Sequence, residues 1–337
     1  MVNIAVIGIG EWGKNHVRVL KEIKEFNLSS ICDVNDKSLE KMKELYNIKV
    51  IKDYREIMED DNVQAVTICT PSDTHYQIAK QALEAKKHVL VEKPITLNSN
   101  EAKELIEIAT ENQLVLMVGH IFRYNNALNY LRDKIKSDEL GKIYYLTSNR
   151  FGLRVPRKDS GVIFNYAIHD IDILNFLLEK QYPLEVSVMG SSFFNQELED
   201  VAFISLLYDD GILGQISVSW LPPKKTRDVA VIAEKKSIYI NTLTQELSIF
   251  DTGIVPKYSD LGTFTWITKE GDELRPRIEN QEPLKEELRD FYHAITQKVK
   301  PKADAEIGLT VVQTAEACLL SMKSKRTIIM EEFLKNL

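Results

Sequence analysis

The sequence predicts an α/β protein whose N-terminal part is a doubly wound parallel sheet. Short apolar runs alternate with segments of helical periodicity up to about residue 120, which is the pattern of parallel strands joined by crossover helices. The first apolar run leads directly into a glycine-rich turn, and runs rich in β-branched residues dominate from residue 184 onward. A chain of 337 residues has room for two domains with a sizeable core.

Composition and charge indicate which class of protein and which kinds of partner to expect. The 44% hydrophobic and 28% charged residues are typical of a globular protein, and the formal net charge of -7 argues against a nucleic-acid partner. An acidic chain can still bind an anionic small molecule in a locally basic pocket. Cys32, Cys69 and Cys318 are widely spaced without a metal-binding pattern, so we expect reduced core residues. We find no signal peptide or membrane span, and we therefore expect a cytoplasmic protein without a membrane partner.

The first expected strand, residues 3–7, precedes the pattern Gly-x-Gly-x-x-Gly, which in this context is a dinucleotide fingerprint. Gly8 allows a tight turn, Gly10 lets a pyrophosphate approach the backbone, and Gly13 lets the next helix pack on the strand. That helix, expected to run to about residue 24, would point free N–H groups at the phosphates. The expected cofactor contacts of this turn are Gly8, Ile9, Gly10, Glu11, Trp12 and Gly13.

Asp33 ends the second expected strand, residues 28–32, and lies 20 residues after Gly13. An acidic group at this spacing binds the adenosine ribose hydroxyls. A carboxylate would repel a 2′-phosphate, and residues 34–36 offer no arginine in its place, so we prefer NAD over NADP. The alternative role for Asp33 is a cap or turn residue before the helix expected over residues 37–46.

Strands and helices continue to alternate, with further strands expected over residues 65–69, 88–91 and 114–118 and helices up to residue 84 and over 99–112. Ser72 or Asp73 would cap the helix that ends near residue 84. The carboxyl ends of parallel strands meet at one edge of the sheet, which is where ligands bind in open α/β folds. That edge would gather Gly8, Asp33, Thr70, Glu92, Lys93, Gly119 and His120.

The run Glu92-Lys93-Pro94 follows the strand expected over residues 88–91. Pro94 lacks an N–H and has a fixed φ, so it would end the strand and hold Lys93 extended, where its amine can meet a substrate hydroxyl. Taken alone, the run favours a strand that simply ends in two surface charges.

Together these motifs resemble the Gfo/Idh/MocA family of NAD(P)-dependent oxidoreductases over essentially the whole chain. The matching pieces are Gly8-x-Gly10-x-x-Gly13, Thr70-Pro71-x-x-x-His75, Glu92-Lys93-Pro94, Arg123 and Ile168-His169-Asp170-Ile171-Asp172. The resemblance implies a Rossmann domain, residues 1–120, and a substrate-binding and oligomerisation domain, residues 121–337, with a large, mostly antiparallel open sheet. It also implies an active site between the domains, with Thr70, Pro71, His75, Glu92, Lys93 and Arg123 at the cofactor.

A closer resemblance is to the nucleotide-sugar members, the UDP-N-acetylglucosamine 3-dehydrogenases. It depends on residues 119–125, on Arg150-Phe151-Gly152 with Pro156-Arg157, and on residues 161–163 and 167–172. The chain departs from that pattern at Asn165, where members usually carry aspartate, and at Phe122 and Asn126. The implied substrate-binding residues are Lys93, Arg123, Tyr124, Asn125, Arg150, Arg154, Arg157, Asn165 and His169.

Two segments of the second half carry candidate chemistry. Arg150, Arg154, Arg157 and Lys158 lie among glycine and proline, which predicts either a mobile basic loop that grips a diphosphate or a solvated loop. The segment 165–178 has helical periodicity, which would place Asn165 and Asp172 one turn to either side of His169. The alternatives for this histidine are a core position or a metal site, and no third ligand motif favours a metal.

Strands are expected over residues 143–148, 184–189, 200–208, 212–220, 228–233 and 237–240, and helices over 126–137, 284–295 and 305–321. The turn signal Tyr208-Asp209-Asp210-Gly211 predicts an antiparallel pair between residues 201 and 220. His293, in the helix over 284–295, is expected to be structural or exposed, and the helix over 305–321 to pack on the body. The resemblance implies that the bare face of the sheet makes a contact in a homodimer or homotetramer.

The predicted function is NAD-dependent oxidation of a secondary sugar hydroxyl, the 3-hydroxyl of a UDP-N-acetylhexosamine if the closer resemblance holds. The hydroxyl proton would pass to the catalytic residues Lys93 and His169. One alternative is a dehydrogenase of a free sugar or inositol, or an NAD-dependent glycosidase. Another, from a different class, is a non-catalytic NAD-binding regulator, which the departure at Asn165 keeps open.

Overall fold

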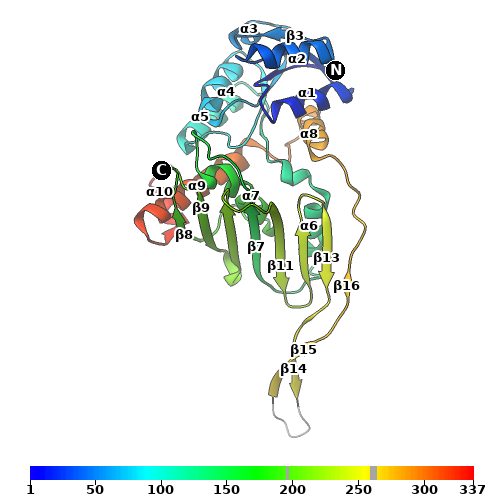
Figure 1. Ribbon diagram of the computed structural model, residues 1–337, viewed down its shortest axis with the longest axis vertical. Coiled ribbons are helices and arrows are strands. Elements are labelled where there is room, and N and C mark those ends of the chain that lie inside the picture. The colour runs from blue at the N-terminus through cyan, green and yellow to red at the C-terminus, as the bar shows by residue number, and fades with distance from the viewer. Residues whose placement is uncertain (195–196, 259–263) are drawn as a thin grey trace. The chain divides into compact units, whose positions relative to one another are not determined.

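The computed structural model describes residues 1–194, 197–258 and 264–337. The chain divides into two compact units (Figure 1). The first unit contains Met1–Tyr124 and Glu282–Glu316, and the second contains Asn125–Gln281 and Ala317–Leu337. These units differ from the expected division after residue 120 in two respects: the boundary follows Tyr124, and residues 282–316 belong with the N-terminal part.

The first unit is built on a six-stranded parallel sheet with the order β3-β2-β1-β4-β5-β6, which confirms the predicted Rossmann topology. The central strands are buried on both faces, as their continuous apolar runs predict. The strands are β1 (Val2–Ile7), β2 (Phe26–Cys32), β3 (Lys49–Ile51), β4 (Ala65–Ile68), β5 (His88–Val91) and β6 (Leu116–Val118).

The helices of this sheet begin and end close to the predicted positions, whereas β3 and α3 were too short to be predicted. They are α1 (Gly13–Glu22), α2 (Asp36–Tyr46), α3 (Arg55–Met58), α4 (His75–Glu84) and α5 (Ser99–Glu111). The expected cap of α4 is wrong. Ser72–Thr74 forms a short 3-10 turn, and Thr74 occupies the capping position without a side-chain hydrogen bond to the helix.

Helix α8 (Pro283–Gln297) belongs to the first unit because its apolar face joins that unit's core. Leu284, Leu288 and Phe291 are buried in the same cluster as Phe26, and the Phe26 and Phe291 rings stack with their centroids 6.1 Å apart. Burying three such side chains contributes about 1.5–3 kcal/mol each. The contact between Phe26 and Phe291 could not be predicted from the sequence, because the two residues are far apart in the chain and only the fold brings them together.

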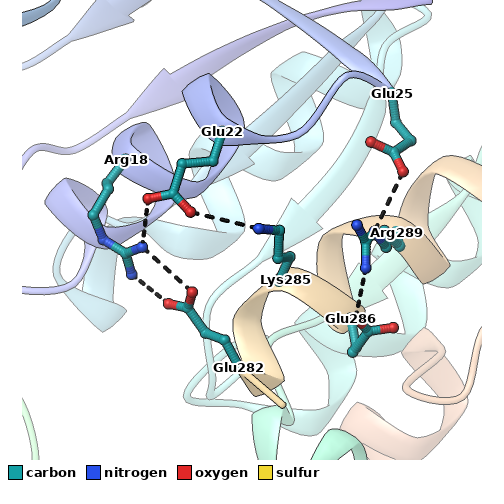
Figure 2. Close-up of polar contacts among 7 residues, drawn as sticks. All are labelled: Arg18, Glu22, Glu25, Glu282, Lys285, Glu286 and Arg289. Carbon is teal, nitrogen blue, oxygen red and sulfur yellow. Dashed lines mark hydrogen bonds and ion pairs between the residues drawn. The ribbon is translucent and has the colours of Figure 1, made fainter.

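Ion pairs also join α8 to α1 and to the residues just after α1 (Figure 2). Arg18 contacts Glu22 and Glu282, and Arg289 contacts Glu25 and Glu286. The partners keep a quarter to two fifths of their side-chain surface exposed. Exposed pairs of this kind stabilise a protein by no more than about 1 kcal/mol each, so apolar packing is the main attachment of α8.

The second unit is built on a nine-stranded sheet with the order β16-β13-β12-β11-β7-β10-β9-β8-β17. The pair β7–β10 is parallel and the other pairs are antiparallel, which confirms a large, mostly antiparallel sheet. The strands are β7 (Ile143–Phe151), β8 (Glu185–Ser191), β9 (Val201–Leu207), β10 (Leu213–Ser219), β11 (Thr226–Ala233), β12 (Ser237–Asn241), β13 (Glu246–Phe250), β16 (Glu273–Leu274) and β17 (Ile328–Ile329). The predicted turn is confirmed, since Asp209–Gly211 joins β9 to β10.

Helices cover one face of this sheet, and the alternation along the strands follows from that cover. Leu146, Ile204 and Ile216 are buried, while their neighbours along the strands, such as Phe203, are exposed on the other face. The helices that follow the Rossmann part are α6 (Asn126–Lys136), α7 (Ile168–Leu178), α9 (Ala305–Ser324) and α10 (Met330–Lys335). None of the helices in the described part of the chain combines the length and the apolar character needed to cross a membrane.

A feature that the sequence did not predict is a hairpin formed by β14 (Gly253–Tyr258) and β15 (Phe264–Lys269). It forms a separate two-stranded sheet and projects beyond the ends of β13 and β16 (Figure 1).

Candidate dinucleotide and hydroxyl-oxidising site

The glycine turn after β1 has the geometry that its three glycines predict. Gly8 has a φ of 92°, and a Cβ there would lie 2.7 Å from the Thr70 nitrogen. A Cβ on Gly13 would lie 1.9 Å from the Gly8 oxygen, so helix α1 can pack on the turn only without a side chain at this position. A Cβ on Gly10 would meet no atom within 4 Å. This side of the turn is therefore open, as a pyrophosphate that approaches the backbone requires.

The rest of the turn divides into exposed and buried positions. Glu11 and Trp12 are exposed, and the first turn of α1 carries no acidic residue that would oppose an anion. The side chain of Ile9 is buried in the core, so only the backbone of this residue remains for a ligand. The residues present thus fit a dinucleotide at the turn, with Ile9 contributing through its main chain.

Asp33 lies directly beside the glycine turn. Its Oδ2 accepts a hydrogen bond from the Ile9 N–H at 2.5 Å, and its Oδ1 accepts one from the Asn35 N–H at 2.8 Å. The alternative role as a helix cap is wrong, because Asn35 occupies the capping position of α2 and accepts from the Ser38 N–H. A carboxylate at the end of β2 and next to the turn is where ribose hydroxyls would be bound.

His75 holds two loops together and has no ring nitrogen left for a ligand. Its Nδ1 lies 2.7 Å from the Pro94 oxygen and its Nε2 lies 3.0 Å from the Thr70 oxygen. The residue is only 1% exposed, and burial lowers the pKa of its imidazole. The direct contact between His75 and the cofactor stays a prediction, and it would not use the ring nitrogens. Its structural role is to hold the Thr70-Pro71 segment against the segment after Lys93.

Glu92 is a buried residue at the end of β5, and it connects α1 to Lys93. Its Oε1 lies 3.0 Å from the His16 Nε2, and its Oε2 accepts a hydrogen bond from the Lys93 N–H at 3.3 Å. A Cβ on Gly119 would lie 2.9 Å from Oε2, so the glycine after β6 leaves room for this carboxylate. Lys93 itself is half-buried, and its peptide bond to Pro94 is cis. His16 was not predicted as a site residue, because its only signal in the sequence is its position three residues after Gly13.

Further buried acidic and thiol groups lie around Glu92. Glu287 of α8 is 0% exposed, and neither of its oxygens has a hydrogen-bond partner among the described residues. Burial, together with the negative charges of Glu92 and Asp290, raises the pKa of Glu287 well above its usual range, so we treat it as a neutral acid. Burial raises the pKa of the Cys69 thiol in the same way.

Three of these groups offer atoms that a metal ion could use. Ligand atoms of His16, Cys69 and Glu92 lie within 4.8 Å of one another. We assign no metal to them, because His16 already bonds Glu92 and because the Cys69 thiol keeps its proton. The predicted absence of a metal stays a prediction.

Two of the residues predicted to bind substrate after β6 have structural contacts inside the protein. Tyr124 is buried, and its hydroxyl donates to the Asp290 Oδ2 at 2.7 Å. Asn125 is buried and caps α6, since its Oδ1 accepts from the Leu128 N–H. The Tyr124 hydroxyl and the Asn125 Oδ1 are thus engaged inside the protein, and the contacts of these residues with a substrate stay predictions. Arg123 is half-buried and donates to the Lys302 oxygen at 3.3 Å.

His169 lies at the start of α7, directly after an irregular turn. Residues Ile163–Ala167 form a π-helix, and the α-helix begins only at Ile168. The prediction of a regular helix from residue 165 is therefore wrong. Because a π-helix has a wider turn, α-helical spacing does not give the relation between Asn165 and His169. Single π-turns are frequent at functional sites. Asn165 and Asp172 are buried, whereas His169 is half-buried.

Asp170, the residue after His169, is fixed to β7. Arg150 donates to it through Nε at 2.7 Å and through Nη2 at 2.9 Å, and the Ser148 hydroxyl donates at 2.6 Å. Arg150 is buried within β7, which runs three residues further than predicted. The prediction that Arg150 belongs to a mobile basic loop is therefore wrong. The arginine holds the start of α7 on the sheet and so positions the segment that carries His169.

The remaining basic residues lie in the loop after β7. Arg157 makes a bidentate pair with Asp159, with both distances 2.7 Å. Arg154 and Lys158 are exposed. The loop therefore presents fewer cations than its sequence suggests, because Asp159 occupies the Arg157 guanidinium.

Both parts of the chain match family models. Residues 2–120 match the model described as an oxidoreductase family with an NAD-binding Rossmann fold, and residues 132–330 match the model of the C-terminal alpha/beta domain of the same family, Gfo/Idh/MocA. These two matches cover most of the chain.

Named relatives cover nearly the whole chain at low identity. Myo-inositol 2-dehydrogenase of Thermotoga maritima is 26% identical over 344 residues, covering 98% of this chain and 99% of that protein. UDP-N-acetylglucosamine 3-dehydrogenase of Acidithiobacillus ferrooxidans is 28% identical over 311 residues, covering 92% and 94%. The crystal structure of the WlbA dehydrogenase from Bordetella pertussis in complex with NADH and UDP-GlcNAcA shares the fold, with a TM-score of 0.79, 20% identity and coverage of 97% and 98%.

Proposed function

The chain belongs to the Gfo/Idh/MocA oxidoreductase family, and on that premise we propose that it uses NAD to oxidise the 3-hydroxyl of a UDP-N-acetylhexosamine. The observation that carries the proposal is the position of Glu92 and Lys93. They directly follow β5 at its carboxyl end, in the same parallel sheet as the glycine turn. A lysine at this edge belongs to the part of a Rossmann sheet where ligands bind.

The first unit would bind the cofactor. The turn at Gly8, Gly10 and Gly13 would hold the pyrophosphate, and Asp33 would bind the adenosine ribose hydroxyls in preference to a 2′-phosphate. When bound, NAD supplies the acceptor for the hydride that leaves the carbinol carbon. The protein's own task is to orient the hydroxyl and to take its proton.

Lys93 is our candidate for the group that takes this proton. Its main chain is held by the Glu92 carboxylate, and Glu92 is held in turn by His16, so the base of the lysine side chain has a fixed position. A general base must reach the hydroxyl with defined geometry, and such anchoring contributes to it. In the second unit we propose His169 as a further proton-handling group, positioned by the Asp170–Arg150 pair that follows it.

Two candidate classes of substrate fit the second unit. The UDP-N-acetylglucosamine 3-dehydrogenase relative favours a nucleotide sugar, and the exposed Arg154 and Lys158 would meet a diphosphate. A second candidate is an inositol or a free sugar. The myo-inositol 2-dehydrogenase relative and the engagement of Arg157 by Asp159 favour that alternative.

The test is the appearance of NADH absorbance with a panel of substrates. The panel contains UDP-N-acetylglucosamine, UDP-N-acetylgalactosamine, UDP-glucose, myo-inositol, scyllo-inositol and N-acetylglucosamine. Each is assayed with and without a coupled acceptor in case product release limits turnover. We expect turnover with a UDP-N-acetylhexosamine. Turnover with inositols or free sugars alone would replace the proposed substrate by the second candidate. NAD binding without turnover of any compound would favour a regulator.

A further inference from the structure

Arg227, near the start of β11, is a half-buried arginine that pairs with no carboxylate among the described residues. Its Nη1 donates to the Phe151 oxygen and, at 2.7 Å, to the Thr226 oxygen. Neither carbonyl uses the edge formed by Nε and Nη2, which carries the other N–H groups of the guanidinium. The guanidinium lies over the Tyr166 ring, with its Cζ 5.0 Å from the ring centroid. These contacts fix the position of the cation while leaving its charge without an acidic partner.

Arg227 lies beside a second arginine, and the aspartate next to them pairs with that second one. The register places Arg227 directly opposite Arg150, so both side chains lie on the same face of the sheet. Asp170 already binds Arg150 through both of its oxygens. Burial and the charge of Arg150 lower the pKa of the Arg227 guanidinium. An arginine whose charged form is disfavoured in this way is stabilised by an anion that binds beside it.

The π-helix beside Arg227 contains no acidic residue. Its Tyr166 contacts the Arg227 guanidinium and also meets the Trp220 ring edge to face, with 6.3 Å between the ring centroids. Asp228, the residue after Arg227, is exposed on the opposite face of β11. Because the π-helix leads directly into the segment that carries His169, a ligand on Arg227 would lie next to that segment.

Two loops run side by side after β7 and β10, and both carry cations. The Gly152 N–H donates to the Ser219 oxygen at 3.2 Å, and the Arg154 N–H donates to the Trp220 oxygen at 3.0 Å. A Cβ on Gly152 would lie 3.5 Å from the Lys225 Cγ, so the loops are in contact. Neither loop, residues 152–158 or 220–226, contains an acidic residue. Their exposed cations are Arg154, Lys158, Lys224 and Lys225.

We propose that Arg227 is the central residue of an anion subsite in the second unit and that this subsite binds the diphosphate of the nucleotide sugar. A guanidinium edge can donate two parallel hydrogen bonds to one phosphate group, and the exposed cations of the two loops would attract the other. Arg150 and Arg157, which the sequence suggested for this task, are engaged by Asp170 and Asp159. The inference rests on the proposed function, and it names a binding residue that lies outside the predicted basic loop.

The first test is the binding of UDP to the NAD-loaded full chain, measured by calorimetry. We expect Arg227→Met to weaken UDP binding at least tenfold and to lower the salt dependence of the affinity, because one cation no longer meets the diphosphate. Arg275→Met is the matched control, since Arg275 is an exposed arginine of the same unit that pairs with Glu273, and it should bind UDP like the wild type. An unchanged UDP affinity in Arg227→Met overturns the inference while leaving the proposed function in place. A wild type that binds no UDP also overturns it, and the substrate panel then decides whether the nucleotide-sugar substrate is lost too.

Steady-state kinetics separates anion binding from a purely structural role. The KM of Arg227→Met for the UDP-sugar should rise at least tenfold while kcat stays within about threefold, because the contact with a non-reacting group is made in the ground state and the transition state alike. The KM for any inositol that the chain oxidises should not change, since an inositol carries no phosphate. A lower kcat with an unchanged KM would contradict anion binding and would assign Arg227 to holding Tyr166 in place.

Two further measurements keep the result free of folding artefacts. Arg227→Lys keeps the charge without the planar fork, so it should lose less UDP affinity than Arg227→Met. In the wild type, phenylglyoxal labels accessible arginines, and mass spectrometry of peptides gives the labelling rate at each one. We expect bound UDP to slow the labelling of Arg227 at least fivefold and to leave that of Arg275 unchanged. Equal labelling of Arg227 with and without UDP overturns the proposal.

Discussion

The His16 Nε2 lies 3.0 Å from the Glu92 Oε1, so the helix after the glycine turn is joined directly to the carboxyl end of β5. Glu92 also accepts the Lys93 N–H, which makes one hydrogen-bonded line from α1 to the candidate catalytic lysine. Both side chains are buried, where a polar group without a hydrogen-bond partner is costly. The link places the two halves of the predicted site, the phosphate turn and the lysine, in a fixed relation within the first unit.

Lys93→Met should abolish turnover while leaving NAD affinity near that of the wild type. The variant keeps the length of the side chain but removes the group that takes the hydroxyl proton. Turnover is measured by NADH absorbance and NAD affinity by calorimetry. Lys80→Met, on the surface of α4 where the lysine pairs with Glu104, is the matched control and should be active. Retained turnover in the Lys93 variant would remove this lysine from the mechanism.

A double-mutant cycle should reveal coupling between His16 and Glu92. His16→Ala leaves the carboxylate without its buried partner, which should cost about 1–3 kcal/mol of unfolding free energy. Glu92→Gln in the same background should cost less than it does alone, because the contact with His16 is already gone. Urea denaturation of the four proteins measures both effects. Strictly additive losses would show that the 3.0 Å contact contributes no coupling.

Glu287→Gln should change how stability depends on pH. The pKa of Glu287 is raised in the folded protein, so the folded state binds its proton more tightly than the unfolded state does. Its stabilising contribution is present below the ordinary value near 4.5 and is lost as the pH rises towards the folded pKa, at up to about 1.4 kcal/mol per pH unit.

The wild type should therefore lose stability relative to Glu287→Gln between pH 5 and pH 8, as measured by denaturation at each pH. Glu286→Gln, on the same helix but half-exposed, serves as the control and should leave the wild-type pH dependence in place. Parallel pH profiles for the wild type and Glu287→Gln would contradict the assignment of a neutral buried acid.

Arg150→Met should destabilise the fold rather than weaken substrate binding alone. It leaves the buried Asp170 with Ser148 as its remaining side-chain donor, and breaking a buried pair in this way costs about 3–5 kcal/mol. The double variant Arg150→Met with Asp170→Leu should recover part of that loss, because no charge is then buried. If the variant has normal stability and a raised KM, Arg150 would instead be assigned to substrate binding.

Arg154→Ala should raise the KM for a UDP-sugar by roughly tenfold with little change in kcat, since it removes a cation that would meet the diphosphate in both ground and transition states. Lys142→Ala, an exposed cation in the turn before β7, is the control and should leave KM unchanged. An unchanged KM in the Arg154 variant would count against a diphosphate substrate and in favour of an inositol or free sugar.

Local patterns were enough to predict much of the fold. Strand-glycine turn-helix at the N-terminus and alternating elements up to residue 120 predicted a doubly wound parallel sheet, which is confirmed. The Asp-Gly turn at residues 209–211 predicted the β9–β10 pair. Such features depend on neighbours in the sequence, so periodicity and turn chemistry reveal them.

The sequence does not show which polar side chains have partners inside the protein. Arg150 was predicted in a mobile loop but is buried in β7 on Asp170, and Tyr124 and His75 contact groups that are separated from them in the chain. The π-turn before His169 was not predicted either, because α-helical and π-helical segments share one apolar pattern.

The sequence by itself determined the class of the fold, the phosphate turn and the position of Lys93, because each follows from residues adjacent in the chain. Only the tertiary structure decided that α8 completes the first unit, that His16 supports Glu92, that Glu287 is buried as an acid and that a hairpin arm projects from the second sheet. These outcomes depend on which distant groups are brought together and which are excluded from water, and burial and pairing of that kind have no signature in a local stretch of sequence.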